Sequence, residues 1–229
     1  MAGQDSIFRS IFNNKDRMLE LYNAINETGH RDAEAITRID LDDVFPVLVR
    51  NDIAFIFKNR LLIIEHQLSV NANTPLRMGI FFSRVCVDLL GFDPLTTGKE
   101  IPSGFKIPNP EFVVLYCGGE DYPAEGILKL SDLVAGNKNK KNSDNGNVFI
   151  NVRVLNINRG CNPELERRSK TLASYAAFIA KFRENLVQVP IIEAIEPDID
   201  DDILMEYSVQ DNSELIDMMM REVKAEVKY

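Results

Sequence analysis

The feature that most constrains the fold is a pair of short apolar segments joined by two polar residues. The segments span residues 52–57 and 60–67, and Lys58 and Asn59 separate them. This spacing predicts a β-hairpin, in which Asn59 at the second loop position tolerates the positive φ that such turns need. A two-residue loop places Asp52 opposite Glu65. A three-residue loop would instead place Asp52 opposite the next residue, 66.

Glu65, His66 and Gln67 end the second segment, after the continuous apolar run 61–64. Such a run is typical of a strand buried on both faces, and side-chain alternation puts Glu65 and Gln67 on one face and His66 on the other. Two carboxylates facing each other at the edge of an apolar interior repel unless one is protonated or a cation binds between them. Asp52 and Glu65 are therefore either a cation site or two charges on a solvated strand end.

Composition bounds the class of protein. The 229 residues suffice for one large domain or one domain with an appendage, and the net charge of −9 argues against wholesale nucleic-acid binding without excluding a local basic face. The three cysteines have no CxxC spacing, and an odd number fits no disulfide framework, so we expect buried thiols in a cytoplasmic protein. We expect no signal peptide and no contact with a membrane, because no apolar run approaches the roughly 18 residues that a membrane helix needs.

Periodicity and turn residues predict the remaining elements. Helices are expected at about 16–26 and 74–90, the second capped by Thr74 and ended by Gly91. A strand is expected within 36–49, where 36–41 alternates like an edge strand and 44–49 is apolar but holds Pro46. Further strands are expected at 112–117 and at 148–157, the last on a sheet edge, residues 126–130 lead into a strand or a turn, and one long helix is expected at 161–187. An acidic stretch at 193–202 and an amphipathic helix at 213–228 complete the chain.

Charged residues on the two predicted helices each allow two interpretations. Glu20 stands off the apolar stripe of its helix, so it faces solvent or is directed at Asp52 and Glu65. Arg77 lies in the first turn of the helix after the hairpin, and it either extends to water or reaches back towards the carboxylates. The lysine-bearing segment 136–147 is a solvated loop or a loop that contacts phosphate.

The order of helix, three strands, helix and strand, with acids on two neighbouring strands, is the frame of a metal-dependent nuclease site. Hydrolysis of a phosphodiester needs a cation that polarises the phosphoryl oxygen and activates water. Magnesium prefers oxygen ligands, so one or two carboxylates and the substrate phosphate suffice. The residue two positions after the second acid would orient water or stabilise developing charge.

Three motifs in this order resemble the Rpn family of recombination-promoting nucleases, also described as transposase-like proteins, in the PD-(D/E)XK superfamily. The motifs are Asn51-Asp52, then Glu65-His66-Gln67, then Asn71-Ala72-Asn73-Thr74-Pro75-Leu76-Arg77. The likeness extends over about residues 7–185, including the opening helix and the proline-led strand at 108–116.

The resemblance implies an α/β, restriction-endonuclease-like fold, with a mixed sheet flanked by helices, in residues 1–187. Residues 188–229 would form an acidic linker and a C-terminal helical extension. It also implies a DNA endonuclease that depends on Mg²⁺, or on Mn²⁺, and acts in recombination, mobile-element or phage-defence biology. DNA is then the expected partner, and a homodimer is an assembly that the family allows.

Carried over residue by residue, the resemblance makes Asp52 and Glu65 metal ligands. Gln67 takes the position of the superfamily lysine, and because glutamine is neutral the missing positive charge must come from elsewhere, with Arg77 as the candidate. Glu20 would be an auxiliary carboxylate. The alternative is a nuclease-like fold that no longer cuts and serves as a binding or scaffold protein, which the neutral Gln67 and the acidic net charge favour.

Overall fold

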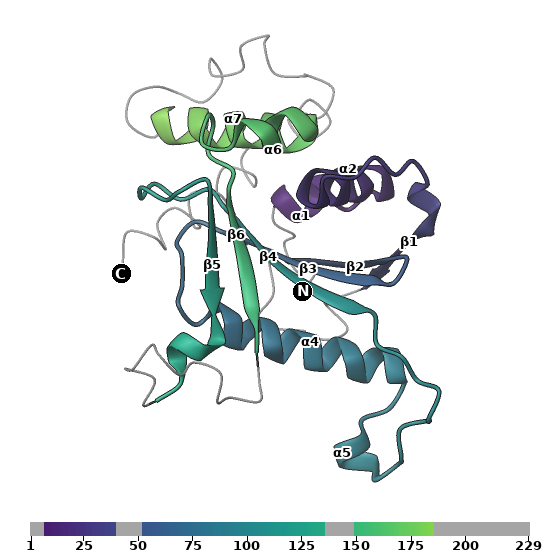
Figure 1. Ribbon diagram of the computed structural model, residues 1–229. Helices are drawn as coiled ribbons and strands as arrows, with labels where there is room; N and C mark the ends of the chain where they lie inside the picture. The colour runs from purple at the N-terminus through teal and green to yellow at the C-terminus, as the bar shows by residue number, and fades with distance from the viewer. Residues whose placement is uncertain (1–6, 40–51, 136–148, 186–229) are drawn as a thin grey trace.

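The computed structural model describes residues 7–39, 52–135 and 149–185, which form a mixed α/β fold around a six-stranded sheet (Figure 1). The strands are β1 (Ile36–Ile39), β2 (Asp52–Phe57), β3 (Arg60–Gln67), β4 (Asn109–Tyr116), β5 (Glu125–Lys129) and β6 (Asn151–Asn156). Their order in the sheet is β1-β2-β3-β4-β6-β5. The β1–β2, β2–β3 and β5–β6 pairs are antiparallel, whereas β3–β4 and β4–β6 are parallel, so the sheet is mixed.

Helices cover both faces of this sheet (Figure 1). The helices of the described ranges are α1 (Ile7–Ile11), α2 (Lys15–Asn26), α4 (Thr74–Leu90), α5 (Pro94–Thr97), α6 (Pro163–Arg168) and α7 (Lys170–Asn185), with short 3-10 turns at Ala33–Ala35 and Leu130–Leu133. Of these, α5 projects away from the sheet (Figure 1). The predicted order of helix, three strands, helix and strand is confirmed by the run from α2 to β4.

Side-chain alternation along the strands divides the core into two layers. Leu62 and Ile64 of β3 pack with residues of α1, α2, α6 and α7, whereas Leu61 and Ile63 pack with Met78 of α4 and its neighbours. Both sets are fully buried, as the continuous apolar run 61–64 predicted. Each face of β3 is thus covered by a different set of helices.

The predicted hairpin is confirmed in its two-residue form. Phe57 pairs with Arg60 and Asp52 pairs with Glu65, so the three-residue alternative is wrong. The positive φ falls on Lys58, at +55°, and not on Asn59 as predicted. The first loop position therefore has the left-handed conformation, which is less favourable in free energy for a lysine than for a glycine.

Two expectations about the C-terminal half are wrong. β6 lies between β4 and β5, and β5 takes the sheet edge. The single helix expected over 161–187 is instead two helices, because Ser169 has extended backbone angles (φ −128°, ψ 107°) between α6 and α7. The hydroxyl of Ser169 accepts a hydrogen bond from the backbone N–H of Leu172 (3.0 Å), which starts the second helix anew.

Several predicted features lie outside the described residues. These are residues 44–49 of the strand expected within 36–49, the lysine-bearing segment 136–147, the acidic stretch 193–202, the helix at 213–228 and the boundary between residues 187 and 188. The three cysteines form no disulfide, as expected, but only Cys117 is buried; Cys86 is half-buried and Cys161 is exposed.

Candidate functional site

The candidate site lies at the carboxyl end of β3, on the face that α4 covers. Glu65 and Gln67 follow Leu61 and Ile63 at two-residue spacing, and they are buried to 3% and 8% exposure. A carboxylate this deeply buried costs free energy unless it is paired or hydrogen-bonded. The contacts of these two side chains therefore decide what the site can do.

Arg77 reaches back from the first turns of α4 and forms an ion pair with Glu65, through its Nη2 and the Oε1 of the carboxylate. The chain places Arg77 there because α4 begins just beyond β3, with Pro75 in its first turn and the carbonyl of Asn73 accepting from the N–H of Arg77 at 3.1 Å. The Arg77 side chain is 44% exposed. It therefore spans from the buried carboxylate to the surface.

Thr74 holds Gln67 in place. The Gln67 Nε2 donates to the hydroxyl of Thr74 at 3.0 Å, and Thr74 is fully buried. The prediction that Thr74 caps α4 is wrong by one position, because Asn73 is the cap and Thr74 is the first helical residue. The threonine hydroxyl is consequently available to the glutamine, a role that the sequence did not reveal.

Two oxygens of the site have no hydrogen-bond partner among the described residues: Oε2 of Glu65 and Oε1 of Gln67. Both are buried acceptors on the same face of β3, two residues apart. Native proteins satisfy nearly all such groups, so an unpartnered pair marks a place where a donor or a cation belongs. Carboxylate and amide oxygens are the ligands that Mg²⁺ and Ca²⁺ take in proteins.

Burial raises the pKa of Glu65 above its usual range, and the Arg77 guanidinium and the Gln67 amide offset only part of this effect. Desolvation penalises the charged form of the carboxyl, whereas a nearby positive charge favours it. A raised pKa means that Glu65 takes up a proton more readily than an exposed glutamate. A cation at Oε2 would have the opposite effect.

Asp52 begins β2 and pairs with Glu65 in the register of the sheet. Ala54, two residues along, packs in the core layer that faces α4. The side chain of Asp52 itself lies outside the described part of the chain. The backbone register thus brings residues 52 and 65 together as predicted.

Glu20 is not brought to Glu65. It belongs to α2, on the other face of the sheet, and its carboxylate accepts hydrogen bonds from the Ser169 hydroxyl (2.7 Å), the Thr171 N–H (3.0 Å) and the Thr171 hydroxyl (2.8 Å). These donors sit at the start of α7, where N–H groups lack partners within the helix and the helix dipole favours a negative charge. Glu20 therefore caps α7.

His66 points away from Glu65, into the core layer of α1 and α7. Its Nε2 lies 2.8 Å from the Cys117 Sγ and 3.1 Å from the Tyr175 hydroxyl, and its ring stacks on Phe8 at 5.0 Å between centroids. His66 is 3% exposed. The opposite orientations of residues 65 and 66 agree with the alternation that the sequence predicts.

Close backbone packing next to the site also explains a glycine. A Cβ on Gly118, just after β4, would lie 1.8 Å from the carbonyl oxygen of Leu68, just after β3. Only glycine permits the two chain ends to approach in this way.

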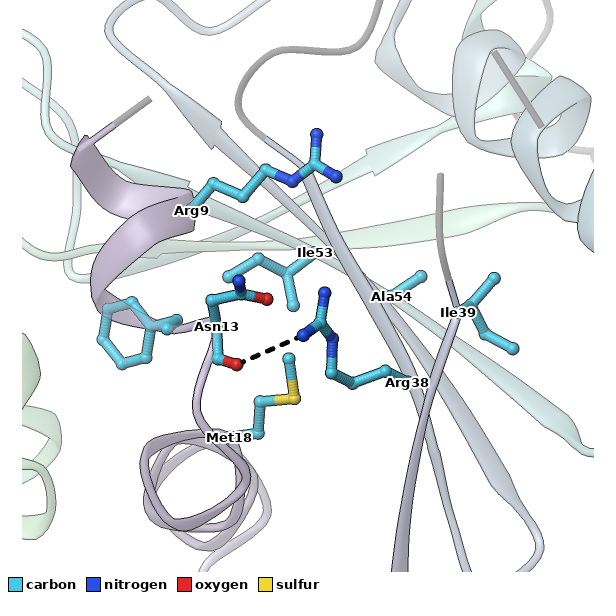
Figure 2. Close-up of a pocket in the computed structure, with 8 residues that line it drawn as sticks. Arg9, Asn13, Met18, Arg38, Ile39, Ile53 and Ala54 are labelled. Atoms are coloured by element: carbon cyan, nitrogen blue, oxygen red, sulfur yellow. Dashed lines mark hydrogen bonds between the residues drawn. The ribbon is translucent and has the colours of Figure 1, made fainter. Parts of the chain in front are cut away.

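A second polar feature is a pocket at the sheet edge, where Arg9, Asn13 and Arg38 surround an apolar floor (Figure 2). It lies beside Ile53 and Ala54, the residues that follow Asp52 in β2.

Among the described residues, no three His, Cys, Asp or Glu side chains gather in a group that could hold a metal ion. A cation at the candidate site would therefore rely on Glu65, on the neutral Gln67 and on residue 52.

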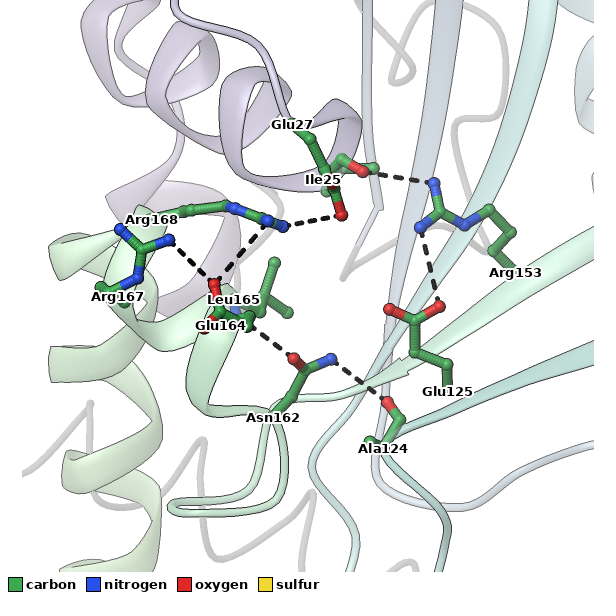
Figure 3. A network of polar contacts seen from close by, with 10 residues as sticks. All are labelled: Ile25, Glu27, Ala124, Glu125, Arg153, Asn162, Glu164, Leu165, Arg167 and Arg168. Atoms are coloured by element: carbon green, nitrogen blue, oxygen red, sulfur yellow. Dashed lines mark hydrogen bonds and ion pairs between the residues drawn. The ribbon is translucent and has the colours of Figure 1, made fainter.

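A third polar cluster connects α2 and α6 to the sheet (Figure 3). Arg168 of α6 pairs with Glu27 at 2.9 Å, and Arg153 of β6 donates to the carbonyl of Ile25 at 3.2 Å and lies 3.9 Å from Glu125. Its carboxylates face arginines. This cluster therefore fixes the helical layer on the sheet and offers no cation site.

Comparison with protein-family models, with curated proteins and with solved structures finds no match for this chain. Within the described ranges, no helix combines the length and the apolar character needed to cross a membrane.

Proposed function

We propose that the chain is a metal-dependent endonuclease of restriction-endonuclease-like fold that hydrolyses DNA phosphodiester bonds, in the recombination, mobile-element or defence setting that the sequence resemblance implies. The observation that carries the proposal is the pair of buried, unpartnered oxygens, Glu65 Oε2 and Gln67 Oε1, on one face of β3. The pairing of residue 52 with Glu65 supports it, because a second carboxylate begins the neighbouring strand.

Glu65, Gln67 and Asp52 would hold the cation. All three offer oxygen donors, the type of ligand that Mg²⁺ and Mn²⁺ take from proteins. A bound divalent cation would supply polarisation of the phosphoryl oxygen and a lowered pKa of the attacking water. Strand alternation predicts that Asp52 shares the face of Ala54, and hence of Glu65.

Arg77 supplies the positive charge that Gln67 lacks. One of its N–H groups holds Glu65 Oε1, which fixes the carboxylate in one orientation and leaves Oε2 without a partner. A guanidinium has five N–H donors, so a half-exposed arginine can hold a carboxylate and still donate to a phosphate oxygen. The loss of the superfamily lysine at position 67 is thereby compensated from α4.

The test is cleavage of supercoiled and linear duplex DNA by the full chain in Mg²⁺, in Mn²⁺ and in EDTA. We expect cleavage with either metal and none in EDTA, and we expect Glu65→Gln and Asp52→Asn to abolish it. Glu100→Gln is the matched control, because Glu100 is an exposed carboxylate in the connection between α5 and β4. Cleavage that survives both site substitutions would overturn the assignment.

The contact between Arg77 and Glu65 also favours a second candidate, a binding protein of the same fold that does not cut. In that protein the guanidinium would neutralise the buried carboxylate permanently. This function predicts neither Mn²⁺ binding at Glu65 nor cleavage of DNA or RNA by homogeneous protein. Titration of Mn²⁺ into the wild type and Glu65→Gln, followed by electron paramagnetic resonance, separates the two candidates.

A further inference from the structure

β5 is an edge strand of the sheet and pairs with β6 on its inner side (Figure 1). The carbonyl of Ala124, just before β5, accepts from the N–H of Asn156 at 2.9 Å. The N–H of Leu130, just after β5, donates to the carbonyl of Ile150, also at 2.9 Å. Because backbone groups alternate in direction along a strand, the even-numbered residues of β5 bond to β6, and the odd-numbered residues direct their N–H and C=O groups outward.

The outward backbone groups are those of Glu125, Ile127 and Lys129. No other described strand pairs with this side of β5. A sheet edge with an exposed apolar side chain is a ready template for pairing with another chain, and Ile127 is 58% exposed. The opposite edge strand, β1, exposes only the polar Thr37 and Arg38. The apolar edge of this sheet is therefore that of β5.

The odd-numbered side chains of β5 lie on the face of the sheet that α4 does not cover. Leu128 packs with the α4 layer, so alternation puts Glu125, Ile127 and Lys129 on the opposite face, and all three are exposed. Glu125 lies 3.9 Å from Arg153 of β6, yet it stays 60% exposed and is open to a second cation. One acid, one apolar residue and one base thus follow each other along the open edge.

The order of these side chains is self-complementary. In an antiparallel pair of two β5 strands centred on Ile127, Glu125 of one copy stands opposite Lys129 of the other, and Ile127 stands opposite Ile127. Every residue in these pairs directs its backbone groups outward, as the hydrogen-bonded positions of an antiparallel ladder require. Moving the centre to Gly126 or Leu128 would separate the opposite charges. Backbone direction and charge therefore select the same register.

We infer that two copies of the chain form a homodimer in which their β5 strands pair antiparallel about Ile127 and join the two sheets into one. The contact is isologous, so the pairing of Glu125 with Lys129 occurs twice. Its two-fold axis is perpendicular to the joined sheet, which puts both α4 faces, and with them both Glu65 residues, on the same side. Short edge strands bury little area, so we expect a dissociation constant in the micromolar range or weaker. The dimer does not depend on nuclease activity, because β5 holds none of the residues proposed for cleavage.

The test is sedimentation velocity of the full chain, without DNA, from micromolar to submillimolar concentrations. We expect a reversible monomer–dimer equilibrium for the wild type. Glu125→Lys and Lys129→Glu should each raise the dissociation constant by about tenfold or more, because each turns two opposite-charge pairs into two like-charge pairs. An equimolar mixture of the two variants should dimerise about as tightly as the wild type, because one copy then presents two lysines and the other two glutamates.

Glu100→Lys is the matched control, because it makes the same change in charge at an exposed position between α5 and β4. Its dissociation constant should stay within about twofold of the wild type. Thermal unfolding establishes that each variant is folded. A wild type that stays monomeric, single variants that dimerise as the wild type does, or a mixture that stays monomeric would each overturn the inference.

Amide hydrogen exchange resolved by residue gives a second readout on the backbone itself. The N–H groups of Glu125, Ile127 and Lys129 should exchange more slowly as the protein concentration rises, because dimerisation gives them carbonyl partners. The N–H groups of Gly126 and Leu128 already bond to β6, so their exchange should change little. Dimerisation that leaves the exchange of the outward N–H groups unchanged would place the contact elsewhere and overturn the pairing of β5.

Discussion

The two faces of β3 are equally buried at its carboxyl end, but their polar groups are satisfied to very different degrees. On one face His66 is 3% exposed, with its Nε2 near Cys117 and Tyr175 and its ring against Phe8. On the other face Glu65 is also 3% exposed, yet its Oε2 has no partner among the described residues. Adjacent positions in one strand thus carry a satisfied and an unsatisfied polar group.

This difference separates a structural role from a functional one. A buried polar group with its partners in place stabilises and orients a core, whereas one left short of partners costs free energy. A fold retains that cost where the group has another use, and active sites are a common place for it. The α4 face of β3 is therefore the face on which to test chemistry, and the α1/α7 face is the one on which to test stability.

The largest expected effect is on cleavage, from Glu65→Gln. The substitution keeps the shape and burial of the side chain but removes the negative charge that a cation and Arg77 would share. We expect cleavage to fall by about 10²-fold or more, the range for loss of a charge-stabilising group in an active site. Single-turnover cleavage with Mg²⁺ measures it. Equal cleavage rates for Glu65→Gln and the control Glu100→Gln would show that Glu65 has no role in cleavage, and the α4 face of β3 would then have no functional role that the other face lacks.

The second effect is on stability, from His66→Ala. Removing a buried ring that packs on Phe8 and Tyr175 should lower the free energy of unfolding by about 3 kcal/mol. Mn²⁺ affinity of the folded protein should stay within about threefold of the wild type, because His66 faces the other core layer. Urea unfolding and Mn²⁺ titration provide the two measurements. Loss of Mn²⁺ binding by folded His66→Ala would contradict the assignment of His66 to a structural face.

A smaller effect is expected from Thr74, which reaches the site only through Gln67. Thr74→Val removes the hydroxyl that accepts from Gln67 Nε2 while keeping the volume of the side chain. Mn²⁺ affinity should fall by about tenfold, as is typical when the residue that orients a ligand is lost. Thr74→Ser keeps the hydroxyl and is the matched control. If both variants bind Mn²⁺ as the wild type does, Gln67 needs no orientation by α4.

The elements around this strand were largely predictable, because their causes are local. A two-residue loop between apolar runs determines the hairpin and hence the pairing of Asp52 with Glu65. The same alternation puts Glu65 and His66 on opposite faces. The end of α4 at Gly91, with φ +76°, follows from the freedom of glycine at that position.

The contacts of Glu20 and the order of the C-terminal strands were not predictable, because they join distant parts of the chain. The caps on α7 from Glu20 span 149 to 151 residues, and the break between α6 and α7 at Ser169 depends on these contacts. The place of β6 inside the sheet likewise depends on its pairing with β4 and β5. No local pattern encodes such contacts, so the sequence left Glu20 either facing solvent or directed at Asp52 and Glu65.

The subtlest expected effect is on the pH dependence of stability. Burial raises the pKa of Glu65 in the folded state. Above the pKa of the unfolded carboxyl, near 4.5, the folded protein therefore holds the Glu65 proton more tightly than the unfolded chain does. The unfolding free energy that Glu65 contributes should consequently fall as the pH rises through the window between the unfolded and folded pKa values. The difference between wild type and Glu65→Gln isolates this contribution.

Mn²⁺ turns this measurement into a test of the unpartnered oxygen. A cation at Oε2 favours the charged carboxylate, so saturating Mn²⁺ should reduce or reverse the fall in stability with pH. Thermal unfolding of both proteins from pH 4.5 to pH 8, roughly spanning the range over which buried carboxyls titrate, in EDTA and in Mn²⁺, provides the comparison. If Mn²⁺ stabilises Glu65→Gln as much as the wild type at every pH, the cation binds elsewhere. The unpartnered Oε2 of Glu65 then lowers the stability of the fold without serving as a metal ligand.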